Sequence, residues 1–127
     1  MALRPGLTGS AQLVVTDGDT AMALGTGDVP VVATPRLAGL AEVAAIDAVR
    51  AELTGTTTTV GYRIQLDHVA PTAVGGTVRA EAILETVASA RLIFRVSISD
   101  DRGLVAAGRI TRVLVERDRF LDRAGRA

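Results

Sequence analysis

Three side chains in this sequence have the chemistry of an acid/base site. Glu42 is the single acidic residue inside the apolar stretch VATPRLAGLAEVAAI. His68 is the only histidine among 127 residues, and Thr34 lies eight positions before Glu42. A carboxylate and an imidazole can exchange protons with a reacting group, and a hydroxyl at a helix start can stabilise a developing oxyanion. Whether they act together depends on the elements that position them.

The first of these elements is a helix that carries Thr34 and Glu42. Thr34 followed by Pro35 is a helix start signal, because Thr is favoured at the N-cap and Pro at the first helical position. Gly55 follows the last apolar residue, so the pattern predicts a helix from about Pro35 to Leu53. At about 100° per residue, Glu42 falls within the apolar stripe of this helix. A carboxylate buried there needs a partner.

Four stretches with period-two alternation follow the helix and predict strands. In the first, Val60, Tyr62, Ile64 and Leu66 share one face, and His68 continues that series on the core-facing side. Short turns join the strands, so the sheet is predicted to be antiparallel, and the long helix covers one of its faces in an α+β fold. The remaining expected elements are strands at Thr77–Val87, around Leu92–Ile98 and at Leu104–Glu116, a short first strand at Ala11–Val15, one helical turn at Ala21–Leu24, and a charged tail from Arg117 that frays or forms a short helix.

The sequence therefore predicts that Glu42 and His68 meet at one helix–sheet boundary as an acid/base pair. Each residue also has a purely structural interpretation: Glu42 pairs with a strand arginine or reaches the rim, His68 packs, and Thr34 caps the helix. Thr34 and Glu42 lie about 12 Å apart along the axis, so they can bracket a small reacting group without contacting each other. Gly61 interrupts its strand, which is typical of a bulge, a close backbone approach or a simple bend.

The composition disfavours several classes of function. The 14 basic residues, all of them Arg, balance 14 acidic residues, and there is one Tyr and no Trp, which argues against a nucleic-acid or anionic-membrane partner. The absence of Cys and the single His leave no thiolate or multi-histidine metal site, so neither a metal nor a cofactor is expected. No signal-peptide or membrane-spanning pattern is visible, and we expect one cytoplasmic domain over residues 1–127.

Taken together, these motifs resemble the hot-dog-fold thioesterases of the fluoroacetyl-CoA thioesterase type. The pattern V-x-A-T-P-x-L-x-x-L-x-E spans Val31–Glu42, V-G occurs at Val60-Gly61, and H-x-A-x-T-x-x-G begins at His68. The C-terminal part of the match consists of Gly108, Arg112 and Phe120.

The resemblance implies a five-stranded antiparallel sheet wrapped around one long central helix and paired edge to edge in a homodimer. It implies hydrolysis of an acyl-CoA thioester to the free acid and CoA, with active sites near the dimer interface. The family's catalytic positions fall on Thr34, Glu42 and His68, and its glycine near the thioester carbonyl falls on Gly61. Arg112 lies at a family-like position, where it either binds substrate or serves as a structural ion-pair partner.

The chain departs from the family in one respect. Residues 17–33 contain no Phe, Tyr or Trp, whereas aromatic residues close the pocket of the fluoroacetyl-specific member. The resemblance therefore leaves open which short acyl group is accepted. Two alternatives are a non-catalytic dimer that binds acyl-CoA or another small ligand, and an enoyl-CoA hydratase. The hydratase is disfavoured because those enzymes carry an Asp/His pair in the helix region, whereas His68 follows the helix on a strand.

Overall fold

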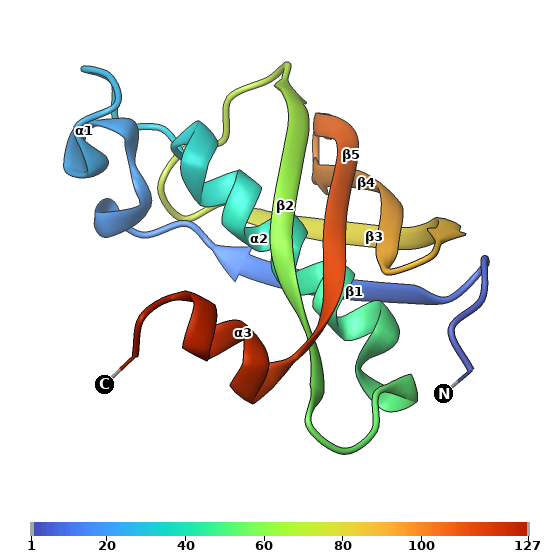
Figure 1. The fold of residues 1–127 in the computed structure, drawn as a ribbon. Coiled ribbons are helices and arrows are strands. Elements are labelled where there is room, and N and C mark those ends of the chain that lie inside the picture. Colours follow the sequence, from blue (N-terminus) through green and yellow to red (C-terminus); the bar gives the residue numbers. More distant parts are fainter. Residues whose placement is uncertain (1, 127) are drawn as a thin grey trace.

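A curled sheet wraps around one long helix in the computed structural model, which describes residues 2–126 (Figure 1). All five strands pair antiparallel, in the order β1-β3-β4-β5-β2, so β1 and β2 form the two edges. This architecture confirms the predicted sheet around a central helix. The elements are β1 (Thr8–Val14), η1 (Asp17–Asp19), α1 (Ala21–Leu24), α2 (Thr34–Val49), η2 (Arg50–Glu52), β2 (Thr57–His68), β3 (Thr77–Ala88), β4 (Arg91–Asp100), β5 (Gly103–Glu116) and α3 (Arg117–Arg123).

The core forms between α2 and the inner face of the sheet. The buried side of α2 is rich in alanine, and the strands contribute larger side chains such as Phe94 and Ile110, which are fully buried. Small helix side chains let the strands approach closely. At Gly9 of β1, a Cβ atom would lie 2.3 Å from the backbone nitrogen of Ala48, so only glycine fits there. No helix in the described part of the chain is both long and apolar enough to span a bilayer.

The start of α2 differs from the prediction in a way that matters for the site. Ala33, in an extended conformation, occupies the N-cap and makes no side-chain capping bond. Thr34 is already the first helical residue, so the interpretation of Thr34 as the N-cap is wrong and its hydroxyl is available for another partner. The α-helical part also ends earlier than expected, at Val49, and continues as the 3₁₀ turn η2.

The predicted alternation along β2 is broken by a bulge. Gly61 pairs with Arg112 and Ile64 with Ile110, and the register shifts between Gly61 and Arg63. Arg112 and Ile110 are two positions apart and are both buried, so Gly61 and Ile64 share the inner face although they are three positions apart. The expectation that Val60 and Tyr62 share this face with Ile64 is therefore wrong.

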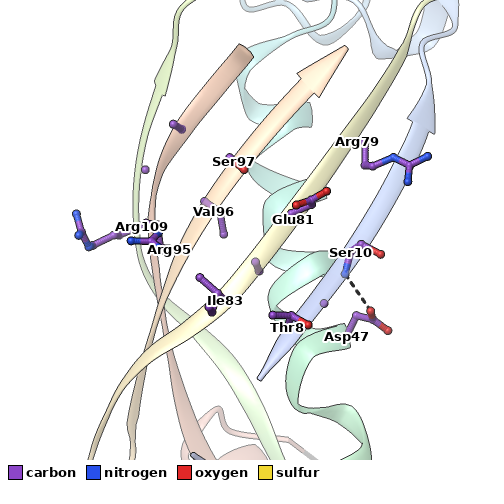
Figure 2. A pocket seen from close by; sticks show the side chains of 14 residues that line it. Thr8, Ser10, Asp47, Arg79, Glu81, Ile83, Arg95, Val96, Ser97 and Arg109 are labelled. Carbon is purple, nitrogen blue, oxygen red and sulfur yellow. Dashed lines mark hydrogen bonds between the residues drawn. The ribbon is translucent and has the colours of Figure 1, made fainter. Parts of the chain in front are cut away.

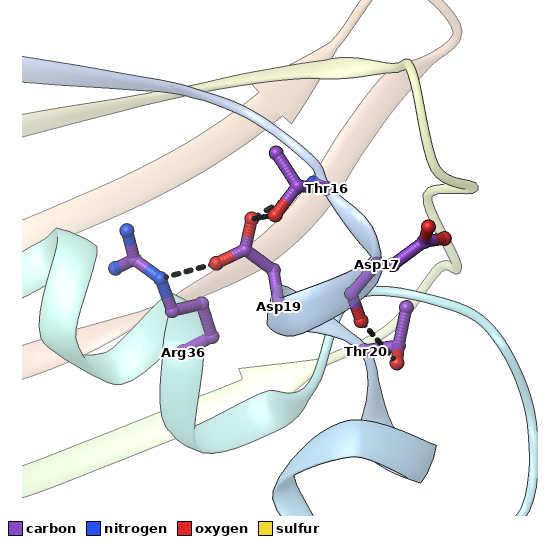
Figure 3. A network of polar contacts seen from close by, with 5 residues as sticks. All are labelled: Thr16, Asp17, Asp19, Thr20 and Arg36. Carbon is purple, nitrogen blue, oxygen red and sulfur yellow. Dashed lines mark hydrogen bonds and ion pairs between the residues drawn. The ribbon is translucent and has the colours of Figure 1, made fainter.

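A polar network ties the loop after β1 to the first turn of α2 (Figure 3). Asp19 accepts hydrogen bonds from the Thr16 backbone and hydroxyl at 2.8 and 2.9 Å, and from Arg36 Nε at 2.9 Å. These bonds, the Thr16 backbone bond foremost, hold the pKa of the Asp19 carboxyl below its usual 3.8. The network fixes the segment that leads into Thr34.

Replacing Asp19 by Asn is expected to lower the free energy of unfolding by about 1 kcal/mol at neutral pH, because three hydrogen bonds lose their ionised acceptor. The native pKa lies below the unfolded value, so the unfolded state binds more protons and this stabilisation is lost as pH falls from 3.8 through the native pKa. Urea unfolding at neutral and strongly acidic pH measures the difference, with Asp28→Asn in the segment between α1 and α2 as the control. An effect that persists undiminished in acid would contradict this account.

Candidate functional site

The first polar pair joins the start of α2 to the end of β2. A hydrogen bond of 2.8 Å links Thr34 Oγ1 and His68 Nδ1. The other ring nitrogen of His68, Nε2, is buried and has no hydrogen-bond partner among residues 2–126. Buried polar atoms are rarely left unpaired, so this nitrogen marks a place where a further polar group fits. The hydroxyl and imidazole can act together on a reacting group placed at Nε2.

The second polar pair lies two helical turns further along α2. Glu42 Oε2 accepts a hydrogen bond from Arg112 Nη1 at 2.8 Å, and the Arg112 side chain is only 7% exposed. Arg112 also donates from Nε to the Thr59 hydroxyl and from Nη2 to the Thr59 carbonyl, both at 3.0 Å. Burial lowers the pKa of the Arg112 guanidinium, and the Glu42 carboxylate opposes that shift. Arg112 therefore holds Glu42 in one position. This contact matches the structural interpretation in which Glu42 pairs with a strand arginine.

Gly61 of β2 lies directly against this carboxylate. A Cβ atom at position 61 would be 2.7 Å from Glu42 Oε2 and 3.7 Å from Arg112 Nη1. Gly61 thus combines the bulge and the close approach that its place in the strand suggested. Because Gly61 has no side chain, the Glu42 carboxylate can approach the β2 backbone at this position.

Within one chain, the structure does not bring Glu42 and His68 together as predicted. Each has its own partner, Arg112 for Glu42 and Thr34 for His68. Gly61 and His68 are seven positions apart on an extended strand, which corresponds to about 20 Å. A small reacting group at Gly61 therefore cannot also reach His68 of the same chain.

The strand that carries Gly61 and His68 is an edge of the sheet. Within residues 2–126, only β5 pairs with β2, and residues 61–65 of β2 are all exposed. On its outer face, the Tyr62 hydroxyl accepts a hydrogen bond from Arg91 at 3.0 Å, and the guanidinium lies over the ring at 4.6 Å. No sequence pattern predicts this Tyr62–Arg91 contact, and none predicts that Thr59 accepts two hydrogen bonds from Arg112. Residues 2–126 contain no group of three His, Cys, Asp or Glu side chains arranged to bind a metal ion.

Comparison with protein families matches residues 15–118 to the fluoroacetyl-CoA-specific thioesterases. Among solved structures, the fluoroacetyl-CoA thioesterase FlK is 28% identical, with a TM-score of 0.90 over 98% of this chain and 96% of that chain. A structure of an FlK variant with fluoroacetate and CoA bound is 29% identical, with a TM-score of 0.85 over 93% of this chain and 99% of the other.

More distant structures share the fold. A thioesterase superfamily member from Thermus thermophilus has 24% identity and a TM-score of 0.88, covering 95% of this chain and 90% of its own. A hot-dog-like protein from Thermanaerovibrio acidaminovorans has 22% identity and a TM-score of 0.86. The match covers 94% of this chain and 89% of that chain. The comparison with curated proteins gives no match.

Proposed function

Because the chain belongs to the fluoroacetyl-CoA-specific thioesterase family, we propose that it hydrolyses a short acyl-CoA to the free acid and CoA. The observation that carries this proposal is the Glu42 carboxylate, which Arg112 holds beside the side-chain-free Gly61. Such a carboxylate suits attack on a thioester, which is already electrophilic and needs mainly orientation and charge stabilisation. Because residues 17–33 contain no aromatic residue, the proposal leaves the identity of the short acyl group open. The proposal retains the cytoplasmic location expected from the sequence.

In the proposed reaction, Glu42 removes a proton from a water molecule as that water attacks the thioester carbonyl carbon. Direct attack by the carboxylate, giving a transient anhydride, is the alternative route. The carbon–sulfur bond then breaks, and the imidazole of His68 donates a proton to the departing thiolate. The Thr34 hydroxyl orients that imidazole through the 2.8 Å hydrogen bond.

This chemistry requires Glu42 and His68 at one thioester, so the proposal includes a homodimer in which they come from different chains. Antiparallel pairing of β2 with β2 of a second copy is the natural use of an open edge strand. If the two-fold axis passes through Gln65, each residue of β2 pairs with a residue of the second copy's β2. The two paired residues lie equally far from Gln65, in opposite directions along the sequence. The bulge leaves Tyr62 on the outer face, so the inward-facing His68 of one chain then lies beside Gly61 of the other, which completes the site with Glu42.

The side chains of β2 support this register. About Gln65, Arg63 faces Asp67 on the outer face and Ile64 faces Leu66 on the inner face, and each pair occurs twice by symmetry. Opposite charges and apolar pairs across strands stabilise a sheet, whereas like charges directly opposite destabilise it. Axes through Arg63 or Asp67 would place like charges opposite each other.

A cysteine at position 65 is expected to form a disulfide between the two copies. The natural chain has no Cys, so Gln65→Cys introduces a single thiol beside the proposed axis. Mild oxidation followed by non-reducing electrophoresis measures the cross-link. The matched control is Gln12→Cys, which changes the same residue type on the opposite sheet edge, β1. Equal cross-linking of the two variants would rule out pairing through β2.

Replacing Gly61 by Ala is expected to lower kcat by about 100-fold. The new methyl group would push the Glu42 carboxylate away from the position it needs for reaction with the thioester. The fold should remain, which a thermal melt monitors. Gly39→Ala is the control: it lies on the helix surface, where Ala is expected to stabilise by about 0.5–1 kcal/mol and leave kcat unchanged. Normal turnover in Gly61→Ala would mean that the position of Glu42 is unimportant.

Release of free thiol from a panel of acyl-CoA thioesters of increasing chain length tests the function directly. The expected result is turnover of short acyl groups that is lost in His68→Ala. Calorimetric binding of acyl-CoA with no thiol release would instead identify a non-catalytic binding protein. Loss of the enoyl-CoA ultraviolet absorbance without thiol release would identify a hydratase.

A further inference from the structure

A cavity of about 870 Å³ lies over the outer face of the sheet and extends past β1 to Asp47 of α2, which accepts a hydrogen bond from the Ser10 backbone at 3.0 Å (Figure 2). Among the lining residues on β3 and β4, four are exposed: Arg79, Glu81, Arg95 and Ser97. Their sequence neighbours, such as Val78 and Phe94, are buried in the core. Small-molecule sites occupy about 300–1,000 Å³, so this cavity has the size of a ligand site. The reaction proposed for Glu42 makes no use of this cavity, because neither Glu42, Gly61 nor His68 lines it.

Short side chains form the floor of this cavity. Ser10, Glu81, Ser97 and Ala107 follow one another across β1, β3, β4 and β5 as directly paired residues. Apart from Glu81, this row carries only a methyl or a hydroxymethyl group at each position. The resulting trough runs across the strands and exposes two hydroxyl groups.

Two arginines stand at one side of the trough. Arg95 and Arg109 are directly paired across β4 and β5, and both contact Glu85, at 3.4 and 2.9 Å. One carboxylate for two guanidinium groups leaves a positive charge without compensation, and like charges in a cross-strand pair destabilise a sheet. Local destabilisation of this kind, here of the sheet by two directly paired arginines, is expected at functional sites. Guanidinium groups bind phosphate oxygens in pairs, so the arrangement fits a phosphate.

The trough also offers hydrogen-bond acceptors. Glu81 takes part in none of the ion pairs found within residues 2–126. Its strand is separated from that of Arg109 by two strand spacings, about 10 Å. A carboxylate and two serine hydroxyls at that distance can bind the hydroxyl or amino groups of a ligand whose phosphate lies at the arginines.

We propose that this cavity binds a nucleotide as a second ligand, separate from the acyl-CoA being hydrolysed. Its phosphate contacts Arg95 and Arg109, and its ribose hydroxyls face Glu81 and Ser97. A protein partner is disfavoured, because the centres of protein interfaces are depleted in charged residues and this face is rich in them. The proposed binding itself does not depend on the thioesterase function, whereas the KM comparison in its test rests on that function.

Calorimetric titration with adenosine 3′,5′-bisphosphate and with inorganic phosphate tests the proposal. The double variant Arg95→Gln/Arg109→Gln is expected to bind the nucleotide at least about tenfold more weakly, because two charge-assisted contacts are lost. The control Arg119→Gln/Arg123→Gln removes the same charge from α3 and should bind as the wild type does. Ser97→Leu fills the trough and should lose the nucleotide while it retains inorganic phosphate. Thermal melts verify that each variant is folded.

Four results would overturn the proposal. The first is the absence of nucleotide binding to the wild type at millimolar concentration, and the second is equal binding to both arginine double variants. The third is a rise in the KM for acyl-CoA in Arg95→Gln/Arg109→Gln, which would assign the cavity to the nucleotide end of the substrate. The fourth is a change in molecular mass by light scattering in the same variant, which would assign this face to contact between copies. Unchanged kcat, KM and mass together with weakened nucleotide binding support it.

Discussion

Replacing Glu42 by Gln is expected to lower kcat for acyl-CoA hydrolysis by about 10²–10⁴-fold, the usual contribution of a general acid or base. Gln keeps the shape and can still accept the Arg112 hydrogen bond, so the fold should be retained. Glu52→Gln makes the same change in η2, where the carboxylate pairs on the surface with Arg4, and should leave kcat unchanged. Free-thiol release measures all three proteins. Wild-type turnover by Glu42→Gln would end the assignment of this residue to the chemistry.

Mixing variants tests whether the site is shared between two chains. In a mixed dimer of Glu42→Gln with His68→Ala, one of the two shared sites keeps both groups. Random pairing of the two variants should therefore restore about a quarter of the wild-type kcat. Mixing Glu42→Gln with Gly61→Ala is the control and should restore nothing, because those residues lie together in one chain. If the first mixture also stays inactive, each site is built within a single chain.

Replacing Arg112 by Met is expected to lower the free energy of unfolding by about 3 kcal/mol, the lower end of the cost of breaking a buried ion pair. The lower end applies because the Glu42 side chain is 30% exposed, so water can reach its carboxylate. Two oxygen atoms of Thr59 lose their donor in the same variant. Activity should fall as well, because nothing then holds Glu42 beside Gly61. Urea denaturation measures the stability.

Two further variants sharpen that experiment. Arg112→Lys should recover only part of the stability, since one ammonium group cannot reproduce the fork that reaches both Glu42 and Thr59. Arg109→Met, on the outer face of the same strand, removes a surface pair with Glu85 and should cost about 0–1 kcal/mol. Similar losses for Arg112→Met and Arg109→Met would show that burial of the Glu42 pair is unimportant for stability.

The sequence by itself determined the elements and their order. The Thr34-Pro35 start and the apolar stripe located α2, and period-two alternation located β2 to β5. Both patterns can be read from the sequence because each depends only on residues a few positions apart. The same local periodicity placed Glu42 on a mostly apolar helix face and identified Gly61 as an interruption. These features do not depend on what packs against them.

Only the tertiary structure decided which side chains meet. The Thr34–His68 contact spans 34 positions and the Glu42–Arg112 contact spans 70, and no local pattern encodes either pairing. The bulge after Gly61 inserts one residue into β2 and moves Gly61, rather than Val60, to the inner face. A single inserted residue reverses the facing of every position on one side of it, so register and bulges, which arise from packing between strands, decided the site.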